Sequence, residues 1–524
     1  MPAALLNFLD EPLLTAASPR GTKARYTLPG SFAALVRGEI AAFSGLRSHQ
    51  RHVWHAFIVQ LAAMALEKAK QSRLPEDETA WRRMLRGLTL MWPDGEPWSL
   101  VVPDASKPAF LQAPVPGGEL PQCRTVETPD GLDMLVTSKN HDLKAARMYR
   151  AAPEDWLFAL VSLQTQQGIM GAGKYGITRM NGGYGSRPVV GLDNPGDAGS
   201  RFRRDVTALI SAAEDKANPH GLSRDGAALV WLKPWNGSTP MDFRDLHPLY
   251  IEICRRVRLV SSGERIFAMD APSSAARISG AAQLNGDTGD AWTPVSAEAK
   301  AFTIAGEGFS CRKLAEVLNP ARFRLPISVQ ISGADATNGV SLVLQSVCRG
   351  QGKTQGFHER RIFLPPEAAS LLKSEREAFT EILERRSGAL GELRLAFRLG
   401  LLVLCQRGEG DSSTGKDAAR KFIDPALERF ETETGRDFFD GLWEEMREPG
   451  ASRGRIYRRW LKEQVARALY MLAGAPRILP HPSSRSYWNR TQSSLAFRAV
   501  LAKSSAFKPV LQLPKAEEGL HAVH

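Results

Sequence analysis

Residues 365–404, PPEAASLLKSEREAFTEILERRSGALGELRLAFRLGLLVL, mark the point at which the chain changes character. After two prolines, apolar residues recur at the spacing of one helix face. They are Phe379, Ile382, Leu383, Leu390, Leu393, Phe397, Leu401 and Leu404. A stripe of this kind needs a partner surface, so the stretch predicts a long amphipathic helix that packs against other helices.

Downstream of this helix the same spacing recurs several times, with polar loops between the patterns. The segments are 422–430, 438–443, 457–472 and 488–501. Helices joined by polar loops predict an antiparallel four-helix bundle over residues 366–508, and their apolar stripes are then its core. We expect the tail, residues 509–524, to be disordered.

Upstream, residues 1–365 mix two periodicities. Ala56–Lys68 is apolar on nearly every side, which predicts a buried helix. Residues 325–348 alternate between apolar and polar, which predicts a β-hairpin or a pair of strands. Prolines and glycines interrupt the remainder. The predicted class is α+β: a large irregular mixed N-terminal domain followed by a C-terminal four-helix bundle.

Composition places the chain among basic, globular proteins. It has 524 residues, a formal net charge of +12, 43% hydrophobic residues and 24% charged residues. A positive excess favours acidic partners, of which nucleic acid is the commonest, although a merely basic surface would give the same number. No apolar run reaches the length of a membrane span, and the first residues lack a signal-peptide pattern. We therefore expect a cytoplasmic protein with no membrane partner.

The five cysteines are scattered and form no C-x-x-C pair, which argues against zinc ribbons and suits a reducing compartment. His49, His52 and His55 share one helix face, but no acidic or cysteine ligand stands near them in sequence. Packed histidines or a polar face are favoured over a metal site there. We expect neither a metal nor a cofactor.

The stretch from Gly168 to Gly191, GIMGAGKYGITRMNGGYGSRPVVG, holds eight glycines, three basic residues and no acid. Glycine lets a backbone approach a ligand closely, and uncompensated cations favour an anion. The basic residues are Lys174, Arg179 and Arg187. The stretch therefore predicts a phosphate-binding loop, with a flexible surface loop as the structural alternative.

A nucleotide is one possible source of that phosphate. Gly168, Gly173 and Lys174 match G-x-x-x-x-G-K, but Tyr175 stands where a magnesium-binding Ser or Thr belongs. The segment before the loop, from Pro153 onward, has the pattern of a capped helix, whereas a P-loop follows a strand. A P-loop-like nucleotide hydrolase is thus the weaker alternative to a nucleic-acid-binding loop.

Two further basic loops suit contact with nucleic acid. Residues 136–150 could grip a sugar–phosphate backbone, and residues 348–361 present an amide at a glycine-flanked tip that could press against a base pair. Residues 277–295 predict two short strands around a tight turn, with Arg277 at their start. The alternative for the two basic loops is that they are ordinary solvated loops, and the alternative for residues 277–295 is a purely structural role.

The order of these pieces resembles the CasA family, the large subunit of the type I-E CRISPR Cascade complex, over nearly the whole chain. The matching motifs are Asp10–Leu14, LRSHQRHVWHAF (46–57), 110–112, TSKNHDLK (137–144), the glycine stretch, GDTGDAWTPV (286–295), 359–361 and the C-terminal bundle. Their order and the overall length make the match more specific than any single motif.

The resemblance implies a non-catalytic subunit that recognises the protospacer-adjacent motif (PAM) on double-stranded DNA, starts unwinding and helps recruit a helicase–nuclease. It implies guide RNA, target DNA and other Cascade subunits as partners. A generic RNA-binding scaffold protein is the alternative. Carried over by position, the DNA-binding residues are Gly168, Gly171, Gly173, Lys174, Arg179 and Arg277; the wedge is Lys353, Thr354 and Gln355; and the guide-RNA handle contacts are Lys139, Asn140 and His141.

Overall fold

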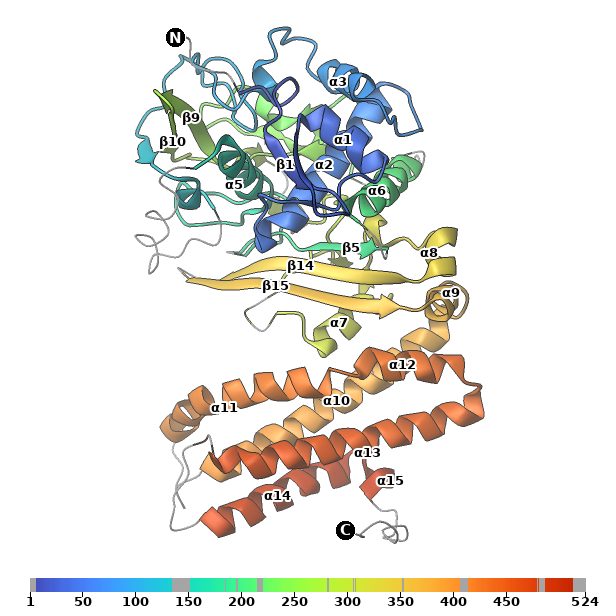
Figure 1. The fold of residues 1–524 in the computed structure, drawn as a ribbon. Helices are drawn as coiled ribbons and strands as arrows, with labels where there is room; N and C mark the ends of the chain where they lie inside the picture. The colour runs from blue at the N-terminus through green and yellow to red at the C-terminus, as the bar shows by residue number, and fades with distance from the viewer. Residues whose placement is uncertain are drawn as a thin grey trace. The chain divides into compact units, whose positions relative to one another are not determined.

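The computed structural model describes residues 6–511 except 134–150, 184, 195–196, 214–219, 280–281, 305, 307, 351–352, 406–412, 478 and 480–485. The chain forms two compact units. The first comprises Met1–Gly308 with Phe323–Leu364, and the second Phe309–Arg322 with Pro365–His524. The first mixes helices with small sheets and the second is helical (Figure 1), which confirms the predicted α+β class.

Helix α2, Ser48–Lys68, is the centre of the first unit. It is buried along nearly its whole length because apolar residues occupy every face from Val53 to Leu66. Helices α3 (Glu78–Gly87), α5 (Pro153–Gln166) and α6 (Ala198–Ala213) pack around it. The helix begins well before the predicted Ala56, since the side chain of Gln50 accepts a hydrogen bond from the backbone N–H of Arg47 at 3.1 Å and closes the first turn.

An antiparallel sheet of β5 (Val189–Asp193), β14 (Val340–Gly350) and β15 (Lys353–Leu364) lies next to this helical layer, in the order β15-β14-β5 (Figure 1). The hairpin predicted within residues 325–348 is wrong. Ile327–Val329 is a 3₁₀ turn and Gly333–Asn338 is the short helix α8. Ser332 caps that helix, and its hydroxyl accepts from the N–H of Asp335 at 3.2 Å. The strand therefore begins only at Val340, and its partner is the downstream segment.

The predicted hairpin at 277–295 is also wrong. Its two strands, β11 (Ile278–Ser279) and β12 (Val295–Ser296), each pair with another strand, β7 (Met241–Asp242) and β13 (Phe323–Arg324) respectively. The 3₁₀ turn Ala282–Leu284 and a left-handed Asn285 redirect the chain between them. The remaining strands are β1 (Leu14–Ala17), β2 (Lys23–Tyr26), β3 (Ala42–Phe43), β4 (Arg124–Val126), β6 (Ala227–Leu229), β8 (Leu246–Ile251), β9 (Arg256–Ser262) and β10 (Arg265–Ala271).

In the second unit, four long helices among those described run side by side (Figure 1). They are α10 (Arg376–Cys405), α11 (Ser413–Thr434), α13 (Gly450–Gly474) and α14 (Ser486–Lys503), accompanied by the shorter α12 (Phe438–Arg447). Phe397 stacks on Phe430 with ring centroids 4.5 Å apart, so the predicted stripe is the core of this unit. The end of the predicted tail, 512–524, lies outside the described residues. Among the described helices, none combines the length and apolarity that crossing a bilayer requires.

Candidate nucleic-acid interface

The glycine stretch leaves the end of α5 and returns to the same place. Gln167 and Ser186 form an antiparallel bridge, and the N–H of Gly168 donates to the carbonyl of Gly185 at 3.0 Å. A Cβ at Gly168 would come within 2.4 Å of the carbonyl oxygen of Gly183. Glycine is therefore required at this position because the two arms of the loop approach so closely.

The tip of the loop is a tight turn from Gly171 to Lys174. The N–H of Lys174 donates to the carbonyl of Gly171 at 3.1 Å. Gly171 has φ +120°, and a Cβ there would meet nothing within 4 Å. A neighbouring segment supports the turn, since the N–H of Ser273 donates to the carbonyl of Gly173 at 3.1 Å. The backbone at Gly171 is thus open to a partner and held in a conformation that suits only glycine.

Lys174 does not stand alone at this tip. Its ammonium group pairs with Asp270 of β10, and the same carboxylate accepts from Nε of Arg124 in β4 at 2.9 Å. Burial lowers the pKa of Lys174, and Asp270 opposes that effect. The side chain of Arg124 is 68% exposed. Two cations share one carboxylate, so the tip carries one net positive charge that an anion can use.

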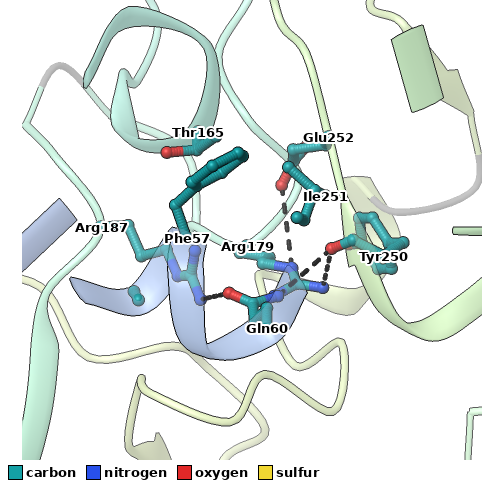
Figure 2. A pocket seen from close by; sticks show the side chains of 9 residues that line it. Phe57, Gln60, Thr165, Arg179, Arg187, Tyr250, Ile251 and Glu252 are labelled. Carbon is teal, nitrogen blue, oxygen red and sulfur yellow. Dashed lines mark hydrogen bonds and ion pairs between the residues drawn. The ribbon is translucent and has the colours of Figure 1, made fainter. Parts of the chain in front are cut away.

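Arg179 and Arg187 are buried, and Figure 2 shows both among the side chains that line a small interior pocket. Nη1 of Arg179 donates to Asp290 at 3.1 Å, and Nε of Arg187 donates to the same carboxylate at 2.6 Å. Burial alone would raise the pKa of Asp290, but the two arginines hold it below its ordinary value. The anion that these arginines face is therefore a carboxylate of the same chain, about 100 residues further on.

Further contacts fix Arg179 in that interior position. Its Nη2 donates to the carbonyl of Tyr250 at 2.8 Å, and its guanidinium lies 4.0 Å from the centroid of the Tyr250 ring. Figure 2 shows Glu252 and Gln60 around the same group. The space between these side chains is about 10 Å³, enough for at most one water molecule. The cluster ties the glycine loop to the core and leaves no room for a ligand.

Arg277 is likewise an interior residue. It is 3% exposed, and its Nη2 donates to the carbonyl of Lys233 at 2.8 Å. Burial lowers its pKa to about 10, so it stays protonated at neutral pH. Its guanidinium lies over the ring of Trp235, 5.3 Å from the centroid. In this fold Arg277 supports the loop 230–235 and does not reach the surface.

The candidate wedge lies at the tip of the β14–β15 hairpin. Cys348 pairs with Gly356 and Arg349 pairs with Thr354, so Gln355 is an extra residue with no opposite partner. This is a β-bulge, a device that bends a strand and changes the direction of a side chain. Lys353 and Thr354 belong to the ladder beyond the bulge, and residues 351–352 at the turn lie outside the described residues.

The end of the glycine loop is bonded to the hairpin at Ser186. The N–H of Ser186 donates to the carbonyl of Val347 at 3.0 Å, and the hydroxyl of Ser186 accepts from the N–H of Val347 at 2.8 Å. The candidate DNA loop and the candidate wedge, far apart in sequence, therefore arise from the same end of the sheet.

Two arginines line the base where these segments meet. Nη2 of Arg255 donates to the carbonyl of Gly168 at 3.0 Å. Burial lowers the pKa of Arg349, Arg255 adds to that lowering, and Asp133 opposes it. One nitrogen of Arg349 is buried without a hydrogen-bond partner among the described residues. Neither arginine is recognisable from the sequence, because nothing in its local pattern separates it from a surface cation.

The handle candidates Lys139, Asn140 and His141 lie outside the described residues, but the start of their segment is described. Asp133 is held by the α2 residues His49, at 2.7 Å, and Gln50, at 2.7 Å. The other two histidines of the trio are separate: His55 contacts Asp205 at 2.7 Å, and His52 stacks on Phe357. No group of three or more potential metal ligands occurs in the part of the chain that the structure describes.

The nucleotide alternative requires a strand, a phosphate loop and a helix in succession. The loop here follows α5, a helix, and closes in a turn at Lys174. The next described helix, α6, begins only at Ala198. A P-loop is therefore contradicted by the structure.

No family model matches the sequence, and no curated protein matches it either. Several solved structures do match the chain. Cse1 from Acidimicrobium ferrooxidans, described as a CRISPR-associated protein, matches with a TM-score of 0.62 and 15% identity, covering 97% of this chain and 100% of its own. CasA (Cse1) from Thermus thermophilus matches at 0.60 and 16%, covering 95% and 99%, and Cse1 from Thermobifida fusca at 0.58 and 13%, covering 95% and 98%. Over nearly its whole length, the chain has the fold of the Cse1 (CasA) structures.

Proposed function

We propose that this chain is the large subunit of a type I-E CRISPR surveillance complex of the Cascade type. In this role it is a non-catalytic, cytoplasmic subunit that recognises the PAM on double-stranded DNA, starts unwinding and helps recruit the helicase–nuclease for antiviral defence. Its partners are the guide RNA, the target DNA and the other Cascade subunits. The similarity of fold to the Cse1 structures supports the proposal.

The observation that carries the proposal is the contact between Ser186 and Val347. Recognition and unwinding must act on adjacent base pairs, so their elements have to project from one place. The open backbone at Gly171 suits a narrow minor groove, where the pattern of base edges is degenerate. The bulged Gln355 suits insertion at the next step, where unstacking costs about a few kcal/mol.

Charge at the loop tip fits contact with a DNA backbone. Lys174 and Arg124 both pair with Asp270. A DNA phosphate can therefore bind one of these two cations while the other stays paired with the carboxylate. In this proposal Gly168 shapes the loop, Gly171 and Gly173 form its tip, and Lys174 contacts phosphate or a base edge. Lys353, Thr354 and Gln355 act as the wedge. Arg179 ties the glycine loop to the interior, and Arg277 supports the loop 230–235.

Lys139, Asn140 and His141 are proposed to hold the 5′ handle of the guide RNA. The described residue that precedes their segment fits this role, because Asp133 is anchored at the start of α2 and lies within electrostatic range of Arg349. The segment is thus attached close to the base of the hairpin. A handle bound there would place the guide next to the DNA that it must pair with.

The test is reconstitution with a guide RNA and the other subunits, followed by selection from target duplexes whose flanking base pairs are randomised. We expect the wild-type complex to enrich a small set of flanking sequences. Gly171→Ala and Lys174→Ala should each reduce that enrichment by about tenfold or more, the scale of one good contact, while the complex still assembles.

Gly21→Ala is the matched control, because Gly21 also has a positive φ (+82°) and nothing within 4 Å of a Cβ. It should leave the selection unchanged. Full enrichment by the Gly171 variant would refute the assignment of this loop. If the chain instead binds RNA of any sequence and no handle-bearing guide co-purifies with the assembly, it is a generic RNA-binding scaffold.

A further inference from the structure

A groove of about 500 Å³ lies at the carboxyl end of α2, among residues that the preceding proposal does not use. Its floor is apolar and its rim is basic. The floor includes Met64, Leu88, Leu229 and Leu232. Its volume falls within the range of ligand-binding clefts, unlike that of the small space around Arg179.

The rim has a surplus of positive charge. Lys68, Lys70 and Lys233 are exposed, and none of these ammonium groups is paired with a carboxylate among the described residues. The lining also contains Glu67, which accepts from Arg224 at 2.6 Å and lies 3.4 Å from His247. Asp225 is the other carboxylate of the lining. Three lysines are therefore available to an incoming carboxylate.

The backbone fixes two of these lysines at the rim. Lys70 has φ +54° at the end of α2, a position where glycine is usual and where another residue costs about 1–2 kcal/mol. Its N–H donates to the carbonyl of Glu67 at 3.0 Å, which closes the helix. The carbonyl of Lys233 accepts from the buried Arg277 at 2.8 Å. At position 70 glycine would avoid the backbone strain, but lysine occupies the position and places a cation at the rim of the groove.

Exposed apolar residues follow Leu88 in the sequence, and a strand with one described partner lines the groove. Just beyond Leu88, the side chains of Leu90 and Met91 are 77% and 89% exposed. Strand β6, which lines the groove, pairs with β8 as its one neighbour among the described strands. An extended segment can add to such an edge through its main chain while its side chains occupy the floor.

We propose that this groove binds an extended acidic peptide segment of a partner protein. Apolar side chains of the segment would occupy the floor, and its carboxylates would pair with Lys68, Lys70 and Lys233. Nucleic acid fits less well, because the apolar floor formed by Met64 and the leucines offers nothing to a sugar–phosphate backbone. This inference is independent of the proposed function.

The test is selection of a displayed library of random twelve-residue peptides on the full chain. We expect enriched peptides that combine Asp or Glu with large apolar residues. Their affinity should fall by about tenfold or more in the double variant Lys68→Glu/Lys233→Glu, because two charge-assisted contacts are replaced by repulsion. Lys23→Glu, an exposed charge reversal on β2, is the matched control and should leave the affinity unchanged.

Lys70→Gly separates binding from folding. The substitution removes both the cation and the backbone strain, so we expect weaker peptide binding together with unchanged or higher thermal stability. The proposal is overturned if no peptide is enriched, or if the enriched peptides bind the rim variants as well as the wild type. It is also overturned if a short oligothymidylate displaces them, because the groove would then bind nucleic acid.

Discussion

Ser186 and Val347 exchange two hydrogen bonds, one from backbone to backbone at 3.0 Å and one from the N–H of Val347 to the Ser186 hydroxyl at 2.8 Å. This pair joins the end of the glycine loop to β14, just before the hairpin tip. The loop and the hairpin are therefore not independent appendages. Whatever shifts one of them relative to the sheet also shifts the other.

Ser186→Ala should loosen this junction. The change leaves the buried N–H of Val347 without its acceptor, which costs about 1–3 kcal/mol in unfolding free energy. Urea denaturation of the full chain measures the loss. Ser341→Ala, in the same strand but half-buried, is the control and should stay within about 0.5 kcal/mol of wild type. Equal stabilities of the two variants would contradict the role assigned to Ser186.

Lys174→Ala should weaken binding to duplex DNA in a salt-dependent way. One phosphate contact contributes about 0.9 to the slope of log K against log salt, so the variant's slope should be smaller by that amount. Fluorescence anisotropy with a labelled duplex, between about 50 and 200 mM salt, measures it. Lys174→Arg keeps the charge and should keep the slope. An unchanged slope for the alanine variant would remove Lys174 from the interface.

Asp290→Asn should destabilise the first unit without altering any surface charge. Asp290 is the carboxylate shared by the buried Arg179 and Arg187, and loss of one partner of a buried pair costs about 3–5 kcal/mol. The midpoint of urea unfolding reports this loss. Asp94→Asn removes an exposed carboxylate and should change the midpoint little. A small effect at Asp290 would mean that the two arginines find other partners.

His52 should make stability depend on pH. Burial lowers its pKa to about 3, so the folded state keeps it neutral while the unfolded chain takes up a proton below about 6.5. Protonation of the unfolded state favours unfolding, so stability falls as the pH drops from about 6.5 towards 3. At pH 5 the loss is about 2 kcal/mol relative to pH 7.

His52→Leu is the variant that isolates this effect. Denaturant unfolding at pH 7 and pH 5 should show a smaller difference between the two pH values in the variant than in the wild type. The gap should be about 2 kcal/mol, because leucine has no proton to bind. Identical pH dependence in the two proteins would mean that His52 is not the group that titrates.

Local periodicity is enough to predict helices whose pattern along the chain is strong, whatever segment they pack against. The stripe from Phe379 to Leu404 became α10, and the pattern after Pro153 became α5. Segments governed by distant partners were mispredicted. Ile327–Val329 alternates like a strand, yet it forms a 3₁₀ turn whose Ser328 hydroxyl donates to the carbonyl of Val190 in β5 at 2.6 Å.

The carboxylates that pair with the basic residues of the site could not be predicted from the local sequence either. The absence of acids within residues 168–191 suggested free cations, but Asp270 and Asp290 meet Lys174, Arg179 and Arg187 from positions about 100 residues away. A sequence window cannot reveal partners at that separation. The glycines were more informative, because the φ of Gly171 and the crowding at Gly168 are local properties of the backbone.

The bulge at the hairpin tip has a consequence for how this protein can vary. Because Gln355 opposes no residue of β14, replacing or deleting it removes no pair from the ladder on either side, Cys348 with Gly356 or Arg349 with Thr354. The tip can thus exchange its chemistry while the sheet keeps its register. That independence makes position 355 the natural place for the chain to diversify, and the first one to mutate in an attempt to retarget it.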